Sequence, residues 1–384
     1  MCPRASTAPA ARSTDTIPGV AIEYSARVRR IPAYPAASAY ALPEDVAQLA
    51  SNESPDPPLP QVIEAITRVL GGLNRYPDPT NAMLRGALSG RYGVPAERIA
   101  IGNGSCDVLL ALGEALLEPG AELVYAWPSF SVYPHLEAAS GATGVRVPLA
   151  AGDVHDLDAM LEQITVATRM VIVCNPNNPT GTAVSRDRIA AFVEQVPRNV
   201  CVLIDEAYCE FNTLDDPDAT LDLLDRHANL VLLRTFSKVY GLAGMRVGFA
   251  LCGSAELVTA VNQVRQPFFC NAAAQAAAVE ALRHQDAVAE RVERAVVARV
   301  ELEDGLGELG IEPMLSQANF TWFELPRRDE EAPADAERRI LAGLTAAGVL
   351  VRSGAALGRA GWLRVSFGTP RENARFLAVL RDLV

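Results

Sequence analysis

The sequence predicts an α/β fold: a three-layer, doubly wound, mostly parallel sheet with a smaller α+β domain beside it. The prediction rests first on three short apolar runs, over residues 170–174, 200–204 and 230–233. Their length and β-branched content are typical of strands that are buried on both faces. Helical patterns such as residues 186–196 lie between such runs. Because strands and helices alternate, the sequence favours parallel strands joined by helical crossovers.

The end of the chain has a different pattern, which predicts the smaller domain. We expect a long helix over 287–309, a strand over 319–325, a helix over 334–347, short strands over 349–352 and 362–367, and a last helix over 371–383. A length of 384 residues suggests two or three domains. We predict a disordered tail over 1–17, an N-terminal arm contributing to the small domain over 18–55, a large domain over 56–275 and the small C-terminal domain over 276–384.

Composition disfavours several classes of function. The formal net charge of −12 is a poor match for nucleic acid or an anionic membrane, because both attract basic surfaces. No run of about 18 apolar residues predicts a membrane-spanning helix, and residues 1–17 lack the apolar core of a secretory signal. The seven cysteines form no CxxC pair and the four histidines have no metal-ligand spacing. We therefore expect a cytoplasmic protein with reduced cysteines and no metal.

Polar residues follow each of the three apolar runs. Residues 175–181 read NPNNPTG, residues 205–208 read DEAY and residues 234–238 read RTFSK. Ligands of parallel sheets bind beyond the carboxyl ends of the strands. The three runs would thus bring an amide, a carboxylate with a phenol, and a lysine to one rim of the sheet.

These motifs, in this order, resemble the fold-type I pyridoxal 5′-phosphate (PLP) aminotransferases of class I/II. The resemblance includes an arginine, Arg246, eight residues beyond Lys238, and it runs from about Tyr34 to the C-terminus. It implies the PLP-transferase fold, with PLP bound by the large domain. Lys238 would hold the PLP aldehyde as a Schiff base and carry a proton once released.

The resemblance also assigns the other groups around the cofactor ring. Asp205 would keep the pyridine nitrogen protonated, which makes the ring an electron sink. Asn178 and Tyr208 would bind the 3′-oxygen of PLP, so Lys238, Asp205 and Tyr208 form the predicted catalytic set. Phe130, two residues past Pro128, would stack on the ring, with Tyr133 as its rival.

The phosphate of PLP needs backbone N–H groups and a cation. Residues 102–106 read GNGSC and precede an apolar helical stretch over 108–117. Glycines permit close backbone approach, and a helix N-terminus favours an anion. The expected phosphate cup comprises Ser105, Cys106, Thr235, Ser237 and Arg246, with the backbone N–H of Cys106 binding in place of its thiol.

Further stretches look like the histidinol-phosphate aminotransferases of histidine biosynthesis. They are IPAY at 31–34, SNESP at 51–55, NRYPD at 74–78, Ser237 directly before Lys238, and WLRVSFGT at 362–369. The main reading is therefore a histidinol-phosphate aminotransferase that uses glutamate and 2-oxoglutarate as its second pair. The resemblance implies a homodimer with shared sites, in which Tyr76 reaches the PLP phosphate of the neighbouring subunit. The expected substrate-binding residues are Tyr34, Asn52, Arg352 and Arg364.

Alternatives share most of these motifs. Aromatic amino-acid aminotransferases of actinobacterial type are similar as well, including SQANF at 316–320, and threonine-phosphate decarboxylases have the same fold and lysine. Residues 353–361 depart from the usual pattern of the family through Ala355, Ala356 and an extra Arg359. Because this segment would form the lip of the substrate pocket, the identity of the substrate stays open. A PLP-fold transcription regulator is disfavoured, because the roughly 30 residues before the fold show no basic helical pattern.

Overall fold

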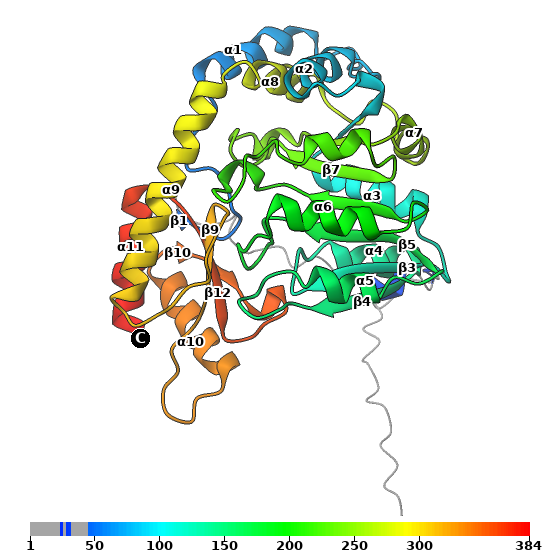
Figure 1. Ribbon diagram of the computed structural model, residues 1–384. Helices are drawn as coiled ribbons and strands as arrows, with labels where there is room; N and C mark the ends of the chain where they lie inside the picture. Colours follow the sequence, from blue (N-terminus) through cyan, green and yellow to red (C-terminus); the bar gives the residue numbers. More distant parts are fainter. Residues whose placement is uncertain (1–23, 26–27, 32–44) are drawn as a thin grey trace, which may run out of the picture.

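A computed structural model of the protein describes residues 24–25, 28–31 and 45–384 (Figure 1). The predicted tail over 1–17, most of the arm and Tyr34 lie outside these residues. The described chain forms a large domain around a seven-stranded sheet and a small domain around a three-stranded sheet. No helix of the described residues is long and apolar enough to cross a membrane.

The sheet of the large domain has the strand order β2-β8-β7-β6-β5-β3-β4. Its strands are β2 (Ile99–Gly102), β3 (Glu122–Trp127), β4 (Thr143–Pro148), β5 (Thr168–Cys174), β6 (Cys201–Asp205), β7 (Leu230–Thr235) and β8 (Gly248–Cys252). Neighbours from β7 to β4 pair in parallel, whereas β8 pairs antiparallel with both β7 and β2. The predicted fold class, a mostly parallel sheet covered by helices, is confirmed.

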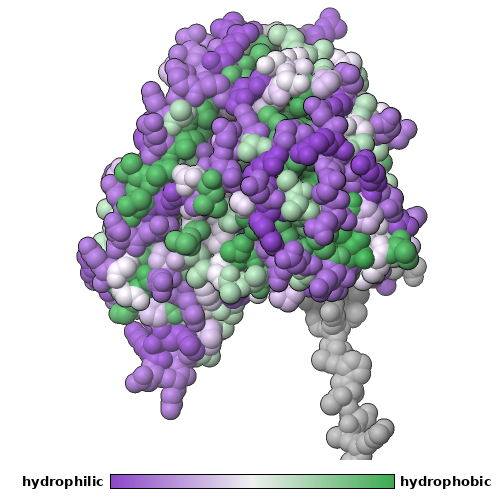
Figure 2. Space-filling view, in the orientation of Figure 1, coloured by the Kyte–Doolittle hydropathy of each residue, from purple (hydrophilic) through white to green (hydrophobic). Residues whose placement is uncertain are grey.

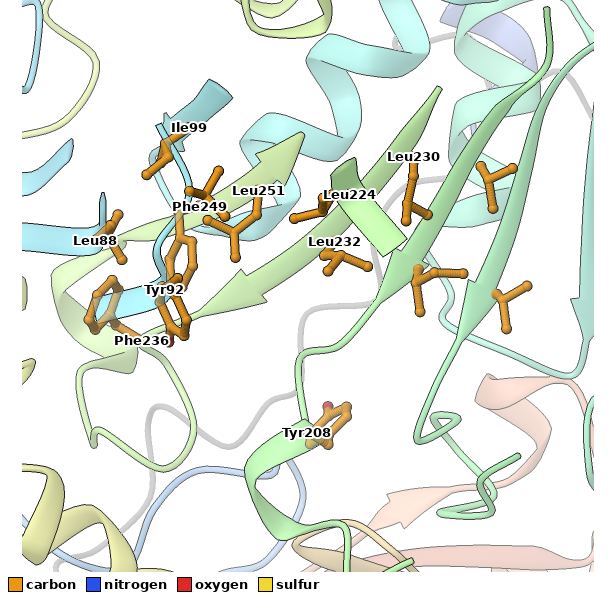
Figure 3. Packing of buried hydrophobic residues seen from close by; sticks show 14 of the residues in the cluster. Leu88, Tyr92, Ile99, Tyr208, Leu224, Leu230, Leu232, Phe236, Phe249 and Leu251 are labelled. Atoms are coloured by element: carbon orange, nitrogen blue, oxygen red, sulfur yellow. The ribbon is translucent and has the colours of Figure 1, made fainter. Parts of the chain in front are cut away.

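Alternation of side chains divides the core of the large domain into two layers. In β6, Val202 and Ile204 belong to one buried cluster and Leu203 to the other. The first cluster includes side chains of α2 (Ala82–Tyr92), α5 (Leu157–Glu162), α6 (Arg186–Gln195) and α8 (Ala272–Ala281). The second includes side chains of α3 (Ser105–Leu116), α4 (Tyr133–Ser140) and α7 (Ala255–Val264). Figure 3 shows part of the first layer, where Leu232 of β7 lies beside Leu251 of β8.

The small domain is built from both ends of the described chain. Its sheet is β11 (Arg352–Ser353), β12 (Trp362–Ser366) and β9 (Phe320–Glu324), all antiparallel. One face packs against α9 (Gln285–Gly307), α10 (Pro333–Ala346) and α11 (Pro370–Leu383) in a third core. β1 (Ala47–Gln48) pairs in parallel with β10 (Val349–Leu350), so the segment before the large domain joins this layer. The exact bounds of the predicted domains stay a prediction.

Long helix α9 connects the two domains. It runs from the region of α1 (Pro60–Val69) and α8 down the side of the small domain (Figure 1). Helices α1 and α8 pack against each other, which fixes the upper end of this connection to the large domain. Hydrophilic residues cover much of the face seen in Figure 2, as the acidic composition suggests.

Candidate active site

The carboxyl ends of β5, β6 and β7 open into a cavity of about 500 Å³. The predicted cofactor residues that line this cavity are Ser105, Cys106, Phe130, Asn178, Asp205, Tyr208, Thr235, Ser237, Lys238 and Arg246. Residues 51 and 53, from the segment before α1, line it as well. The structure therefore brings together side chains from positions more than 190 residues apart, because strand ends meet at one edge of the sheet.

Lys238 lies just beyond β7 with its amine inside the cavity. Its Nζ donates to the Ser51 carbonyl at 3.0 Å and lies 5.7 Å from the centre of the Tyr208 ring. Burial, together with the positive charge of Arg364, lowers the pKa of Lys238 to about 8. The neutral amine is therefore a minor but accessible form near physiological pH, and a nucleophilic or proton-carrying lysine requires that form.

Asp205 is the last residue of β6, and its carboxylate is buried with two hydrogen-bond donors. The Tyr133 hydroxyl donates to Oδ2 at 2.9 Å, and the Ala207 N–H donates to Oδ1 at 3.3 Å. Burial raises the pKa of Asp205 to about 6, and these hydrogen bonds oppose that rise. The carboxylate is thus ionised at neutral pH and can face a cationic ring nitrogen.

A buried hydrogen-bond network joins the two domains above the cavity. Tyr208 accepts from the Asn52 amide at 3.0 Å and from the Asn178 amide at 3.4 Å. Arg364, on β12 of the small domain, donates to Asn178 Oδ1 and to the Ala50 carbonyl, both at 2.6 Å. Burial raises the pKa of the Tyr208 phenol, so its hydroxyl stays protonated and can donate to a ligand.

Asn52 holds an uncommon backbone conformation at this junction. Its φ is 54°, a left-handed value that asparagine tolerates better than most residues. The Ser366 hydroxyl accepts from Asn52 N–H at 2.8 Å and donates to its side-chain oxygen at 3.0 Å. Asn52 therefore links Ser366 of β12 to Tyr208. Both the oxygen and the nitrogen of its side-chain amide already have hydrogen-bond partners.

The start of α3 and Arg246 form a cradle for an anion. Gly104 caps the helix at a φ of 85°, and a Cβ added there would lie 2.4 Å from Arg246 Nη2. Arg246 donates to the Ala243 carbonyl at 2.9 Å and lies 3.5 Å from the Ser237 hydroxyl. Helix N–H groups, a guanidinium and hydroxyls fit a phosphate, so these residues suit the phosphate end of PLP. Burial raises the pKa of the Cys106 thiol to about 11, so it stays uncharged.

The two candidate stacking residues occupy different positions. Phe130 lines the cavity, whereas Tyr133 is fully buried at the start of α4, below the cavity wall. Their rings meet edge to face, with centroids 5.7 Å apart at 89°. Tyr133 contacts Asp205 instead, an arrangement that the sequence reasoning missed although Tyr133 lies three residues after Phe130.

Several predicted residues lie away from the cavity lining. Tyr76 is 81 % exposed and stacks on Phe268 with ring centroids 4.5 Å apart. Arg352 lies directly opposite Arg364 in the β11–β12 ladder, and neither lines the cavity, although Arg364 donates to Asn178, which does. Glu53, which the sequence reasoning did not single out, lines the cavity near Lys238, and its signal was the SNESP stretch.

A mostly parallel sheet that presents a lysine, a carboxylate and an anion cradle at one rim defines a fold-type I PLP enzyme. The family model described as aminotransferase class I and II matches residues 44–380, and the chain belongs to this family. The family uses PLP, which confirms the predicted cofactor. In the described residues, no group of histidine, cysteine and carboxylate side chains could hold a metal ion.

Similar proteins with an assigned activity come from several bacteria. An aromatic amino acid aminotransferase of Cutibacterium acnes is 40% identical over 93% of this chain and 97% of its own length. One from Thermobifida fusca is 45% identical over 87% of this chain and 89% of its own length. The solved histidinol-phosphate aminotransferase of Sinorhizobium meliloti with PLP is 29% identical, with a TM-score of 0.79 over 87% of this chain and 90% of that one.

The anion cradle yields a first prediction. We expect Gly104→Ala to weaken PLP binding on the order of 10–100-fold, because the new methyl group displaces Arg246 and alanine disfavours this φ. Titration of apo-protein with PLP, followed by visible absorbance, measures the effect. Gly90→Ala in α2 is the matched control, since a Cβ there meets nothing within 4 Å. Equal PLP affinity in both variants would contradict the assignment of the cradle.

The buried hydroxyl of Tyr133 yields a second prediction. Tyr133→Phe removes the donor to Oδ2 while keeping the ring, so the pKa of Asp205 rises further above its ordinary value. The ionised carboxylate then appears only at higher pH, and the acid limb of kcat/KM should move upward by roughly one pH unit. The dissociation constant of PLP, measured against pH, should move in the same direction.

Tyr125→Phe is the matched control for this experiment. Tyr125 is also buried in the same layer, but its hydroxyl donates to Glu137 at 3.0 Å. Removing the Tyr125 hydroxyl should leave the pH dependence of kcat/KM and of the PLP dissociation constant unchanged. An unshifted profile in Tyr133→Phe would show that the hydroxyl does not control Asp205.

Proposed function

We propose that the protein is an aromatic amino-acid aminotransferase. It would transfer the amino group of phenylalanine or tyrosine to 2-oxoglutarate, which becomes glutamate. The observation that carries this proposal is its relation to proteins described as aromatic amino acid aminotransferases, at 40–48% identity. The histidinol-phosphate aminotransferase structure from Sinorhizobium meliloti is more distant, at 29%. The alternative prediction, an aromatic amino-acid aminotransferase, is thus preferred to the main one, a histidinol-phosphate aminotransferase.

The side chains above the cavity support a substrate with one carboxylate and one ring. Arg364 is 6 % exposed and is held in place by Asn178 and the Ala50 carbonyl. A guanidinium fixed in this way suits bidentate binding of a carboxylate. Its Cζ lies 5.4 Å from the Phe320 ring, and Phe320 meets Tyr208 edge-on at 5.1 Å. Tyr208 lines the cavity, and an aromatic ring close to this buried arginine is compatible with an aromatic amino acid.

We assign the chemical work to the residues that line the cavity. When bound, PLP supplies an aldehyde carbon for amines and a protonated ring that withdraws electrons. Lys238 would hold the aldehyde end of PLP through Nζ, which its lowered pKa favours, and the same Nζ would take up and return a proton. Asp205, ionised at neutral pH, would face the ring nitrogen. Tyr208 and Asn178 would orient the cofactor by hydrogen bonds, and Phe130 would cover one face of its ring.

Histidinol-phosphate transamination remains the second candidate. The stretches at 51–55, 74–78 and 362–369 favour it, as does the fold likeness to the Sinorhizobium meliloti enzyme. Its substrate presents a phosphate where an amino acid presents a carboxylate, and Arg352 and Arg364 could meet either anion. The two reactions therefore differ in the substrate, while the predicted cofactor residues are common to both.

A substrate panel tests the proposed function. The purified protein with PLP is assayed with 2-oxoglutarate and phenylalanine, tyrosine, histidine, histidinol phosphate or threonine phosphate. We expect kcat/KM for an aromatic amino acid to exceed that for histidinol phosphate by about 100-fold, which corresponds to about 2.7 kcal/mol of transition-state binding. The reverse ranking would reject the aromatic assignment. Lys238→Ala serves as the control and should abolish turnover with every donor while the fold persists.

The exposed position of Tyr76 supports a second proposal, a homodimer with shared sites. A large aromatic side chain that is 81 % exposed suits a contact with another subunit. We expect a mixture of Tyr76→Phe and Lys238→Ala proteins to recover activity above the sum of the two parents at limiting PLP. Hybrid dimers would then contain one site with both native residues. Activity equal to that sum would reject shared sites.

A further inference from the structure

The tryptophans of this chain gather where the small domain meets the large one. The sequence contains three, and they stand at the end of β3 (Trp127), on β9 (Trp322) and at the start of β12 (Trp362). The rings of Trp322 and Trp362 stack with centroids 5.2 Å apart at 27°. Gly358, in the loop between β11 and β12, lies so close that a Cβ there would be 2.8 Å from the indole of Trp127. We call the three tryptophans, Trp127, Trp322 and Trp362, the tryptophan seam.

Arg359 crosses this seam with an ion pair. The two terminal nitrogens of its guanidinium bind the Asp153 carboxylate, with Nη2 donating to Oδ1 at 2.9 Å and Nη1 to Oδ2. The guanidinium also lies over the Trp362 ring, 4.8 Å from its centroid. The side chains of Arg359 and Asp153 are only 29% and 13% exposed. A two-point, largely shielded ion pair of this kind fixes orientation as well as distance.

Asp153 is itself held in an unusual conformation. It lies between β4 and α5 in the large domain, with a φ of 56°. Its carbonyl accepts from the Thr182 hydroxyl at 2.6 Å, directly after the loop 175–181 that carries Asn178. A strained non-glycine backbone persists where the surrounding contacts require it. The anchor of Arg359 is therefore tied to the loop that binds the cofactor.

The loop that carries Arg359 sets the position of the predicted substrate arginines. Arg352 on β11 and Arg364 on β12 are direct partners in the antiparallel ladder, so their side chains share one face. The Arg359 N–H donates to the Gly354 carbonyl at 2.8 Å, and the Gly354 N–H donates to the Trp362 carbonyl at 2.8 Å. These bonds make the loop compact, and a shift at Arg359 would be transmitted to both strands.

We propose that Arg359 is a positioning residue for the substrate carboxylate: through Asp153 it holds the β11–β12 hairpin against the large domain. It so sets the position of Arg352 and of Arg364, which donates to Asn178 of the cavity lining. This role rests on the proposed transaminase function. We do not assign the extra arginine at the pocket lip as a ligand of the substrate, because both of its Nη atoms donate to Asp153 and its plane lies over Trp362. It selects substrates through the placement of other arginines.

The experiment compares Arg359→Gln, Asp153→Asn and the double variant with wild type, each as the PLP-loaded protein. With phenylalanine as donor, we expect KM to rise about tenfold and kcat to change by less than about twofold, because ground-state placement of the carboxylate is lost. The double variant should resemble the single ones, since all three lose one shared interaction. The PLP dissociation constant should stay unchanged, and Arg359→Lys should recover part of the KM. Tryptophan emission should shift to longer wavelength in Arg359→Gln as water reaches Trp362.

Arg146→Gln is the matched control. Arg146 also lies over a seam residue, 5.4 Å from the Trp127 ring, but its ion pair is with Glu137 on α4 in the same domain. Its KM should equal that of wild type. An unchanged KM in Arg359→Gln, an equal rise in Arg146→Gln, or additive effects in the double variant would overturn the proposal. If wild type prefers histidinol phosphate, the aromatic assignment fails, and the same KM comparison with that donor still decides the role of Arg359.

Discussion

The site depends on keeping one negative charge, that of Asp205, buried at the end of the central strand β6. Burial alone disfavours the charged form, as the pKa of about 6 records. Two donors, the Tyr133 hydroxyl and the Ala207 N–H, compensate for part of the lost hydration. This requirement explains why a tyrosine occupies the buried start of α4, where a purely apolar side chain would pack equally well.

The next residue along the chain, Glu206, also carries a buried carboxylate that needs polar partners. Glu206 is buried too, and it pairs with Arg234 at 2.8 Å. Arg234 also binds Asp218 at 2.6 Å, and it stands immediately before Thr235 of the predicted phosphate cup. Asp205 ends β6 and Glu206 follows it directly, and the two carboxylates have different partners and different tasks. One carboxylate serves the cavity, and the other fixes the ends of β6 and β7 to each other.

Sequence order predicted much of this site, since residues that follow parallel strands must meet at one edge. It could not predict contacts made through space by residues outside the motifs. The contact of Tyr133 with Asp205 depends on how α4 begins beneath β6, and the Arg359–Asp153 ion pair depends on how two domains meet. Tyr34 lies outside the described residues, so its predicted role stays a prediction. The role of Tyr76 also stays a prediction, because it requires a second subunit.

The same distinction explains why the cofactor was easier to predict than the substrate. Asn178, Asp205 and Lys238 follow consecutive strands of one rigid sheet, so their spacing in sequence fixes their placement. Arg364 of the small domain donates to Asn178 of the cavity lining, and its position depends on the junction between the domains. Proteins with equal cofactor motifs can therefore accept different anions by moving one hairpin. Under the proposed role of Arg359, substrate choice would depend on how this hairpin is placed against the large domain, which local motifs do not record.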